Sequence, residues 1–222
     1  VYKRQGKNRQ MLGRTHFFIG TAAALAVLQP QTVPALVAGV GAAAIGGLIS
    51  DIDVGTSQAH RDADKIITAT VAVAVLTILA EYKLNLGIYR RLTSDSSVLR
   101  LLTGTAAFLL ICAYGKQQPH RSFMHSFAAL ALLTACVDII YPDVSAYFAV
   151  GFLSHLVLDF FNRKPEKLFW PWKKGFCLGL CSARGLVNRA LLGCGMVSLA
   201  VVLVLSAPAG RLMAKIMRAI YG

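Results

Sequence analysis

The chain has 222 residues, of which 56% are hydrophobic and 15% are charged. This composition excludes an ordinary soluble globular protein and indicates an integral membrane protein. The formal net charge of +13 would also suit a nucleic-acid-binding protein. However, the basic residues occupy short stretches between apolar runs and are not interleaved with aromatic residues, so we expect no nucleic-acid partner.

The first ten residues differ from the rest of the chain. Residues 1–10 include four basic residues, no acidic residue and no apolar periodicity. We expect them to be an appended or disordered segment with Met11 as the true start, and residues 11–222 to form a single membrane-embedded domain. No cleavable signal peptide is expected, because His16 lies at the start of the first apolar run and no convincing cleavage site follows that run.

Seven apolar runs follow in chain order, and each could form a helix that enters a bilayer. They are Phe17–Leu28, Pro34–Ile49, Ile66–Ala80, Val98–Tyr114, Phe123–Ile140, Val144–Phe161 and Ala190–Ser206. Several are shorter than the ~20 residues that a perpendicular span needs, so some are expected to be tilted or interfacial. The sequence therefore predicts an all-α, polytopic transmembrane helical bundle with about five to seven membrane-embedded helices.

Five polar motifs lie at the ends of these apolar runs. They are Thr15-His16, the segment Ser50 to Asp53, the segment His120 to Ser126, Ser154-His155, and Asp159. Ionisable side chains are costly at membrane depth, so their retention indicates a function. If successive runs cross the membrane in alternate directions, all five motifs fall on the same membrane face. The sequence therefore predicts that they form one site.

Most basic residues between the runs fall on that same face. They are Arg14, Arg61, Lys65, Lys116, Arg121, Arg163, Lys164, Lys167, Lys173, Lys174, Arg184 and Arg189. Only four such residues, at positions 83, 90, 91 and 100, fall on the other face. The positive-inside rule therefore predicts a cytoplasmic site. Arg211, Lys215 and Arg218 lie on a C-terminal amphipathic stretch whose side depends on whether the last run spans the membrane.

Two pairs of residues have a spacing that suits metal binding. His155 and Asp159 are four residues apart, so on a helix they project from one face, one turn apart. Asp51 and Asp53 flank Ile52 at the end of the second run, where two carboxylates could bridge two divalent ions. Taken singly, each pair also fits an ordinary polar helix end, such as a histidine satisfied by a nearby carboxylate.

A third motif adds two histidines and an arginine. We expect His120 to lie in the loop that leads into the fifth run and His125 to lie on the helix itself. Arg121 cannot bind a cation, but its planar guanidinium suits a phosphate or carboxylate oxygen. Ser126 and Ser154 adjoin ligand candidates and are expected to hydrogen-bond to them.

Four imidazoles and three carboxylates make up the predicted metal ligands. They are His16, Asp51, Asp53, His120, His125, His155 and Asp159. A mixed nitrogen and oxygen set suits zinc, with manganese or iron as alternatives, better than it suits calcium or copper(I). Seven candidates exceed the needs of one ion, which favours two or more ions, or one ion plus acid–base groups. His60 falls on the same face but is more typical of a solvated loop.

In this order the motifs resemble those of the YdjM-like family of bacterial inner-membrane proteins. The family pattern is Thr-His, then Pro-Asp-x-Asp, then His-Arg-Gly-x-Thr-His-Ser, then Gly-x-x-Ser-His-x-x-x-Asp. Ser50, Ser122 and Met124 replace the proline, glycine and threonine of that pattern, while all the ligand candidates are retained. The resemblance implies a metal-dependent hydrolase of the inner membrane. The family is also described as LexA-binding, but no residue here supports DNA recognition.

The arrangement is also distantly similar to zinc-dependent phospholipase C and P1-type nucleases. That similarity implies hydrolysis of a phosphoester, here in a lipid or lipid-linked substrate, by metal-activated water. Arg121 is expected to stabilise the phosphoryl charge, with Asp53 and His120 as the other catalytic candidates. A divalent-metal or proton-coupled transporter is the main alternative, although it should carry ionisable groups on both faces. A metal-dependent lipid amidase is a third possibility, since it would use the same chemistry.

Overall fold

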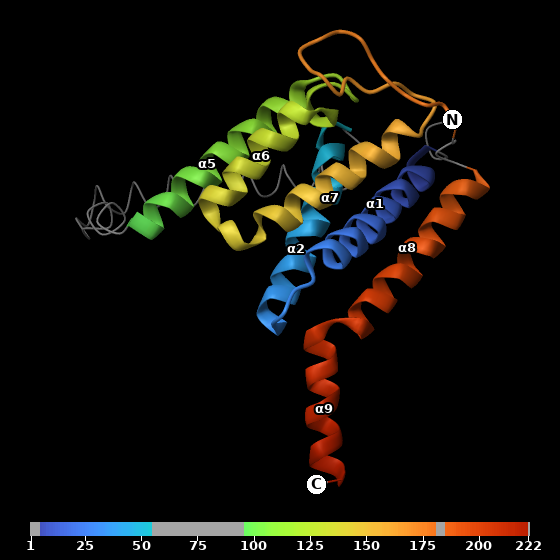
Figure 1. Ribbon diagram of the computed structural model, residues 1–222. Helices are drawn as coiled ribbons and strands as arrows, with labels where there is room; N and C mark the ends of the chain where they lie inside the picture. Colours follow the sequence, from blue (N-terminus) through green and yellow to red (C-terminus); the bar gives the residue numbers. More distant parts are fainter. Residues whose placement is uncertain (1–4, 55–95, 181–184, 222) are drawn as a thin grey trace.

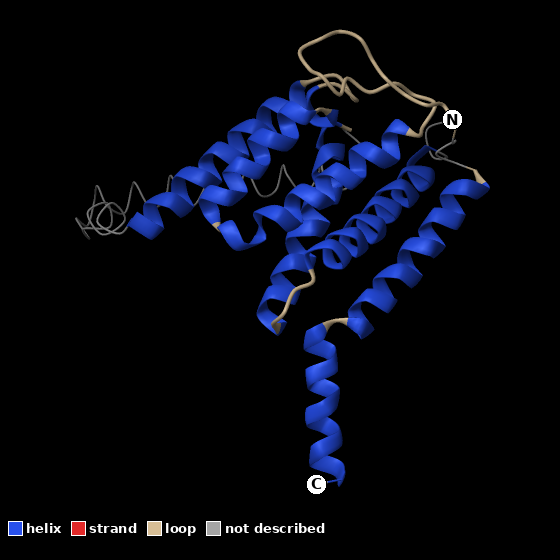
Figure 2. Cartoon of the chain, in the orientation of Figure 1, coloured by secondary structure: helices blue, strands red, loops and turns tan. Residues whose placement is uncertain are grey.

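The computed structural model describes residues 5–54, 96–180 and 185–221 (Figure 1). Across these residues the chain forms helices joined by loops and turns, and no β-strand (Figure 2). The elements in chain order are α1 (Gln5–Leu28), α2 (Val33–Ile49), η2 (Ser50–Asp53), α5 (Ser96–Gln117), η3 (Phe123–His125), α6 (Phe127–Ile140), α7 (Pro142–Phe160), α8 (Leu186–Leu205) and α9 (Ala207–Tyr221).

The described helices confirm the predicted all-α fold. Six of the seven apolar runs lie in helices, and except at the beginning of α1 the helix ends lie within four residues of the predicted ones. The run Ile66–Ala80 and His60 lie outside the described residues. α1 begins at Gln5, so it includes part of the segment that we expected to lie outside the domain. Four helices are long and apolar enough to cross a membrane. These are Val33–Asp53, Ser97–Gln117, Pro142–Phe160 and Leu186–Leu205, and the shorter apolar helices are Gly13–Leu28 and Phe127–Ile140.

α7 packs closely against α1 and α2 at the centre of the bundle (Figure 1). Glycines make this possible, because a Cβ on Gly151 would collide with the carbonyl of Ala43, and a Cβ on Gly46 would collide with the carbonyl of Phe148. Close backbone approach at small residues is a common way to pack membrane helices, which have little hydrophobic driving force between them. The contact fixes the end of α7 beside the end of α2.

The remaining spans pack around this centre. The antiparallel pair α5 and α6 packs on α7, with Phe108 of α5 and Phe148 of α7 in edge-to-face contact. α8 packs along α1, where the Thr15 hydroxyl donates a 3.0 Å hydrogen bond to the Asn188 side chain. Consequently the ends of α2, α5 and α7 and the beginnings of α1, α6 and α8 share one end of the bundle (Figure 2).

Candidate metal centre

The seven predicted ligands come together at this shared end of the bundle. They belong to α1, η2, the segment from residue 118 to η3, and α7. Three overlapping groups place their ligand atoms within 4.8 Å of one another: His16, His155 and Asp159; Asp51, His125 and His155; and Asp53, His120 and His125. The predicted clustering of the motifs is therefore confirmed for the described residues, whereas metal binding by them stays a prediction.

The first group is the most deeply buried. The rings of His16 and His155 stack with their centroids 3.9 Å apart, and His16 Nε2 lies 3.6 Å from Asp159 Oδ1. His155 Nδ1 lies 2.8 Å from the carbonyl oxygen of Gly47. A carbonyl only accepts hydrogen bonds, so Nδ1 donates here and Nε2 is the nitrogen left to bind a metal. That nitrogen faces the cluster, 3.3 Å from His125 Nε2.

Asp53 organises the group that it forms with His120 and His125. Its Oδ1 lies 2.9 Å from His120 Nδ1. Its Oδ2 accepts a 3.2 Å hydrogen bond from the backbone N–H of Arg121 and lies 3.4 Å from His125 Nδ1. The Asp53 carboxylate is buried, whereas the His120 side chain is 40% exposed. His120 therefore lies on the open side of the cluster, where a substrate could reach it.

His125 links the groups and is fully buried. Its Nε2 lies 3.4 Å from Asp159 Oδ2 and its Nδ1 faces Asp53. Burial lowers the pKa of His125, but the nearby carboxylates of Asp159 and Asp53 outweigh burial and raise the pKa to about 10. A divalent cation bound between these two carboxylates would compete with a proton for the imidazole.

The prediction that His125 lies on a helix is wrong. His125 ends the 3-10 turn η3, and α6 begins only after Ser126. The Ser126 hydroxyl caps α6 by accepting from the Ala129 N–H, and it donates to the Phe123 carbonyl. Ser154 likewise donates to the Gly151 carbonyl. These bonds go to the backbone instead of to ligand candidates, contrary to our expectation for both serines.

Arg121 has an unusual backbone conformation, with φ at +64°. A non-glycine residue in this region costs roughly 1–2 kcal/mol, which the hydrogen bond from its N–H to Asp53 helps to offset. The conformation directs the guanidinium into the cluster, where Nη2 lies 2.6 Å from Asp159 Oδ2. Nη1 donates to the Lys164 carbonyl at 2.6 Å. The predicted anion-binding residue therefore lies beside the predicted ligands.

The charges and donors of the cluster fit a divalent cation. Three carboxylates and one guanidinium leave two negative charges when the imidazoles are neutral. Buried carboxylates need compensating charge, and a single divalent cation would supply it. His16 Nδ1 is also buried and has no hydrogen-bond partner among the described residues. Such a set of imidazole nitrogens and carboxylate oxygens suits zinc, manganese or iron.

Two polar residues that the sequence analysis did not predict, Asn162 and Glu166, lie close to the cluster. Asn162 donates a 3.0 Å hydrogen bond to Asp159 Oδ1 from just beyond α7. Its position three residues after Asp159, at a helix end, is the only local signal for this contact. The contact of the Gly47 carbonyl with His155 could not be predicted from the sequence, because every residue has a backbone carbonyl.

Glu166 is the other missed residue. Its side chain is fully buried, and neither carboxyl oxygen has a hydrogen-bond partner among the described residues. Burial raises the pKa of Glu166 to about 8, with smaller opposing effects from His125 and Arg121. Its backbone pairs with Phe176, and the adjacent Lys167 N–H donates to the Arg121 carbonyl. The available signal was that Glu166 is the only acidic residue after Asp159.

The family of the chain follows from comparison with known proteins. The model of a family described as YdjM inner membrane protein matches residues 11–219. Searches of curated proteins and of solved structures found no match. The expected similarity to zinc-dependent phospholipase C and P1-type nucleases therefore stays a prediction. Because the family match covers most of the chain, this protein belongs to the YdjM inner membrane protein family.

Proposed function

We propose that this protein is a membrane-embedded, metal-dependent hydrolase that cleaves a phosphoester in a lipid or lipid-linked substrate. One observation carries the proposal: four histidines and three aspartates from separate parts of the chain converge beside Arg121, whose side chain is only 12% exposed. Isolated polar residues at helix ends would not need to meet in this way. We further propose that this end of the bundle faces the cytoplasm, as the distribution of basic residues predicts.

Each residue has a definite task in this proposal. His16, His155 and Asp159 would hold one ion, and Asp51, Asp53 and His125 would help to hold a second. Zinc, or else manganese or iron, would supply a Lewis acid that activates water and polarises the phosphoryl oxygen.

Two further residues act on the substrate. Arg121 binds the phosphoryl group, whose oxygens replace the present contact of the guanidinium with Asp159. His120 exchanges a proton with the substrate through Nε2, because its Nδ1 is bound to Asp53. Asp53 orients that ring, as the carboxylate of a catalytic triad does.

The position of the cluster favours a hydrolase over a transporter. A transporter should carry ionisable residues near the middle of the membrane and on both faces. Among the described residues, the groups able to hold a metal all lie at one end of the bundle. The same chemistry could cleave an amide, so the choice of bond has to be measured.

A turnover assay with a panel of lipids tests this proposal. The purified protein would be treated with a chelator, reloaded with zinc, manganese or iron, and given glycerophospholipids, polyprenyl phosphates and N-acyl lipids. We expect release of phosphate or phosphoalcohol that chelation abolishes and one metal restores. Turnover that survives chelation would contradict a metal-dependent mechanism, and turnover of the N-acyl lipids alone would identify an amidase.

A further inference from the structure

The C-terminal helix α9 is the least packed part of the described chain. It follows α8 after a break at Ser206 and leaves the bundle in a different direction (Figure 1). Residues 211–219 are all exposed. A helix of this length that stands alone in water would be marginal, so α9 requires a partner or a surface.

The residues of α9 divide into two faces. Arg211, Lys215 and Arg218 are spaced by four and three residues, so they form one narrow basic stripe. The large apolar residues project from the opposite side, and those with described exposure are Leu212, Met213, Ile216 and Met217. The helix contains no acidic residue. A strongly amphipathic, purely basic helix is typical of peptides that lie in the interface of an anionic membrane.

The position of α9 also suits a membrane surface. α8 is long enough to cross a bilayer, and it begins at the end of the bundle that holds the metal centre. α9 therefore begins at the opposite end, at the level where α8 would leave the hydrocarbon (Figure 1).

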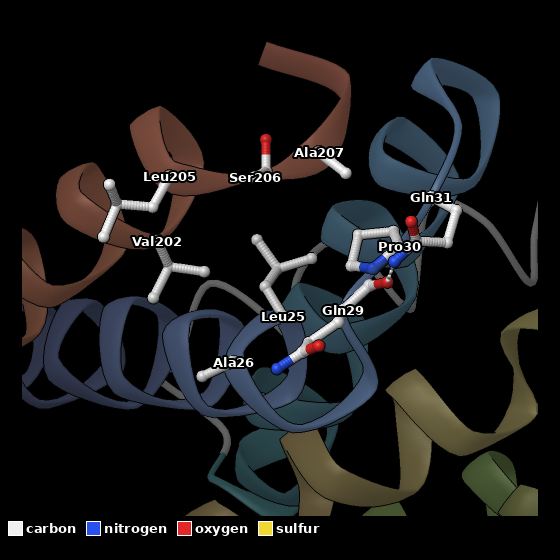
Figure 3. A pocket seen from close by; sticks show the side chains of 9 residues that line it. All are labelled: Leu25, Ala26, Gln29, Pro30, Gln31, Val202, Leu205, Ser206 and Ala207. Atoms are coloured by element: carbon white, nitrogen blue, oxygen red, sulfur yellow. Dashed lines mark hydrogen bonds between the residues drawn. The ribbon is translucent and has the colours of Figure 1, made fainter. Parts of the chain in front are cut away.

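A pocket of about 360 Å³ lies beside the junction of α8 and α9 (Figure 3). Leu25, Val202 and Leu205 form its apolar wall, and Gln29 and Ser206 supply polar atoms. An acyl chain could occupy the apolar part while the headgroup stays near the start of α9.

We propose that α9 lies in the membrane interface opposite the metal centre and binds anionic phospholipids, one of which places an acyl chain in this pocket. Charge complementarity selects this partner, because each basic residue near an anionic surface adds attraction. The apolar stripe then enters the leaflet as the basic stripe contacts the headgroups. This binding is independent of the chemistry at the metal centre.

Hydrogen exchange of the full-length protein in nanodiscs tests the role of α9. We expect the amides of residues 207–221 to exchange several-fold more slowly with 30% phosphatidylglycerol than with phosphatidylcholine alone. The variant R211Q/K215Q/R218Q should lose this difference, whereas the control R163Q/K173Q/K174Q, with exposed residues at the other end, should keep it. Equal exchange in both lipids would overturn the proposal: equally fast exchange would mean no surface binding, and equally slow exchange would mean packing against protein.

The pocket has its own test. Native mass spectrometry would count phosphatidylglycerol molecules retained by the protein. Ala26→Trp should fill the pocket and lower retention by one lipid, whereas Val27→Trp, at an exposed neighbour outside the pocket lining, should not. Equal retention in both variants would overturn the role of the pocket.

Discussion

His155 Nδ1 lies 2.8 Å from the carbonyl oxygen of Gly47, and this contact fixes which nitrogen of His155 faces the cluster. It depends on the close packing of α7 against α2. Metal-binding histidines generally donate their other N–H to a carbonyl or carboxylate, which orients the ring and raises its basicity. The helix contact is thus tied to the geometry of the candidate metal centre.

Separating α7 from α2 should therefore weaken metal binding. In Gly151→Ala, the new Cβ collides with backbone atoms of Ala43. These atoms cannot move aside as the end of a flexible side chain could. We expect a lower melting temperature and at least about tenfold weaker metal binding, as when other contacts that orient a ligand are lost. Gly41→Ala is the matched control, because a Cβ there meets nothing within 4 Å. Equal behaviour of the two variants would contradict the link between packing and site.

Arg121→Lys should reduce turnover with little effect on metal content. A lysine keeps the positive charge, but it lacks the planar guanidinium. Only the guanidinium can contact the substrate phosphoryl group and the Lys164 carbonyl at the same time. We expect kcat to fall by about 10²–10³, as when a donor to the transition state is lost. The control substitution Arg163→Lys, at an exposed residue after α7, should leave kcat unchanged. If Arg121→Lys lost its metal instead, the role of Arg121 would be structural.

His120→Ala should separate proton transfer from metal binding. The His16, His155 and Asp159 group does not include this residue, so we expect metal at that group to be retained. Loss of a general acid or base should lower kcat by about 10²–10⁴ and flatten one limb of the pH profile. An unchanged pH profile with reduced metal content would show that His120 serves only as a ligand.

Glu166 should make stability depend on pH. Burial raises its pKa from the usual 4.5 to about 8, so the folded protein binds the proton more tightly than the unfolded chain. The folded state should therefore lose stability as pH rises from about 4.5 to about 8. Glu166→Gln cannot ionise, so its unfolding free energy should lack this loss and should exceed that of the parent at pH 9. Parallel curves for the two proteins would exclude Glu166 as the source.

Cys177 offers a test of orientation. It is exposed in the loop at the metal-centre end of the bundle. If that end faces the cytoplasm, a membrane-impermeant thiol reagent should label Cys177 in inside-out vesicles but not in spheroplasts when the other four cysteines are replaced by serine. Adding Cys177→Ser to this background should remove the label. An added cysteine at Ser145, near the start of α7 at the other end, should give the opposite pattern. Labelling of Cys177 in spheroplasts would contradict a cytoplasmic site.

The sequence predicted those features that follow from the length of the apolar runs and from the alternating direction of successive membrane crossings. Asp51 and His155 are about a hundred residues apart, but each lies near the end of an apolar run, so counting membrane crossings places both on one face. The turn that carries His125 could not be predicted, because a capping serine, not hydropathy, decides where α6 begins. The burial of Glu166 depends on the loop around it, which has no periodic pattern.

The metal content of one double variant tests the central claim most directly. The protein and His155→Ala/Asp159→Ala would be purified without chelators and analysed by elemental mass spectrometry, with Asp143→Asn at the far end of α7 as control. We predict at least one bound zinc, manganese or iron per chain in the parent and in the control, and loss of at least one ion per chain in the double variant. Equal metal content in all three proteins would contradict the proposed site.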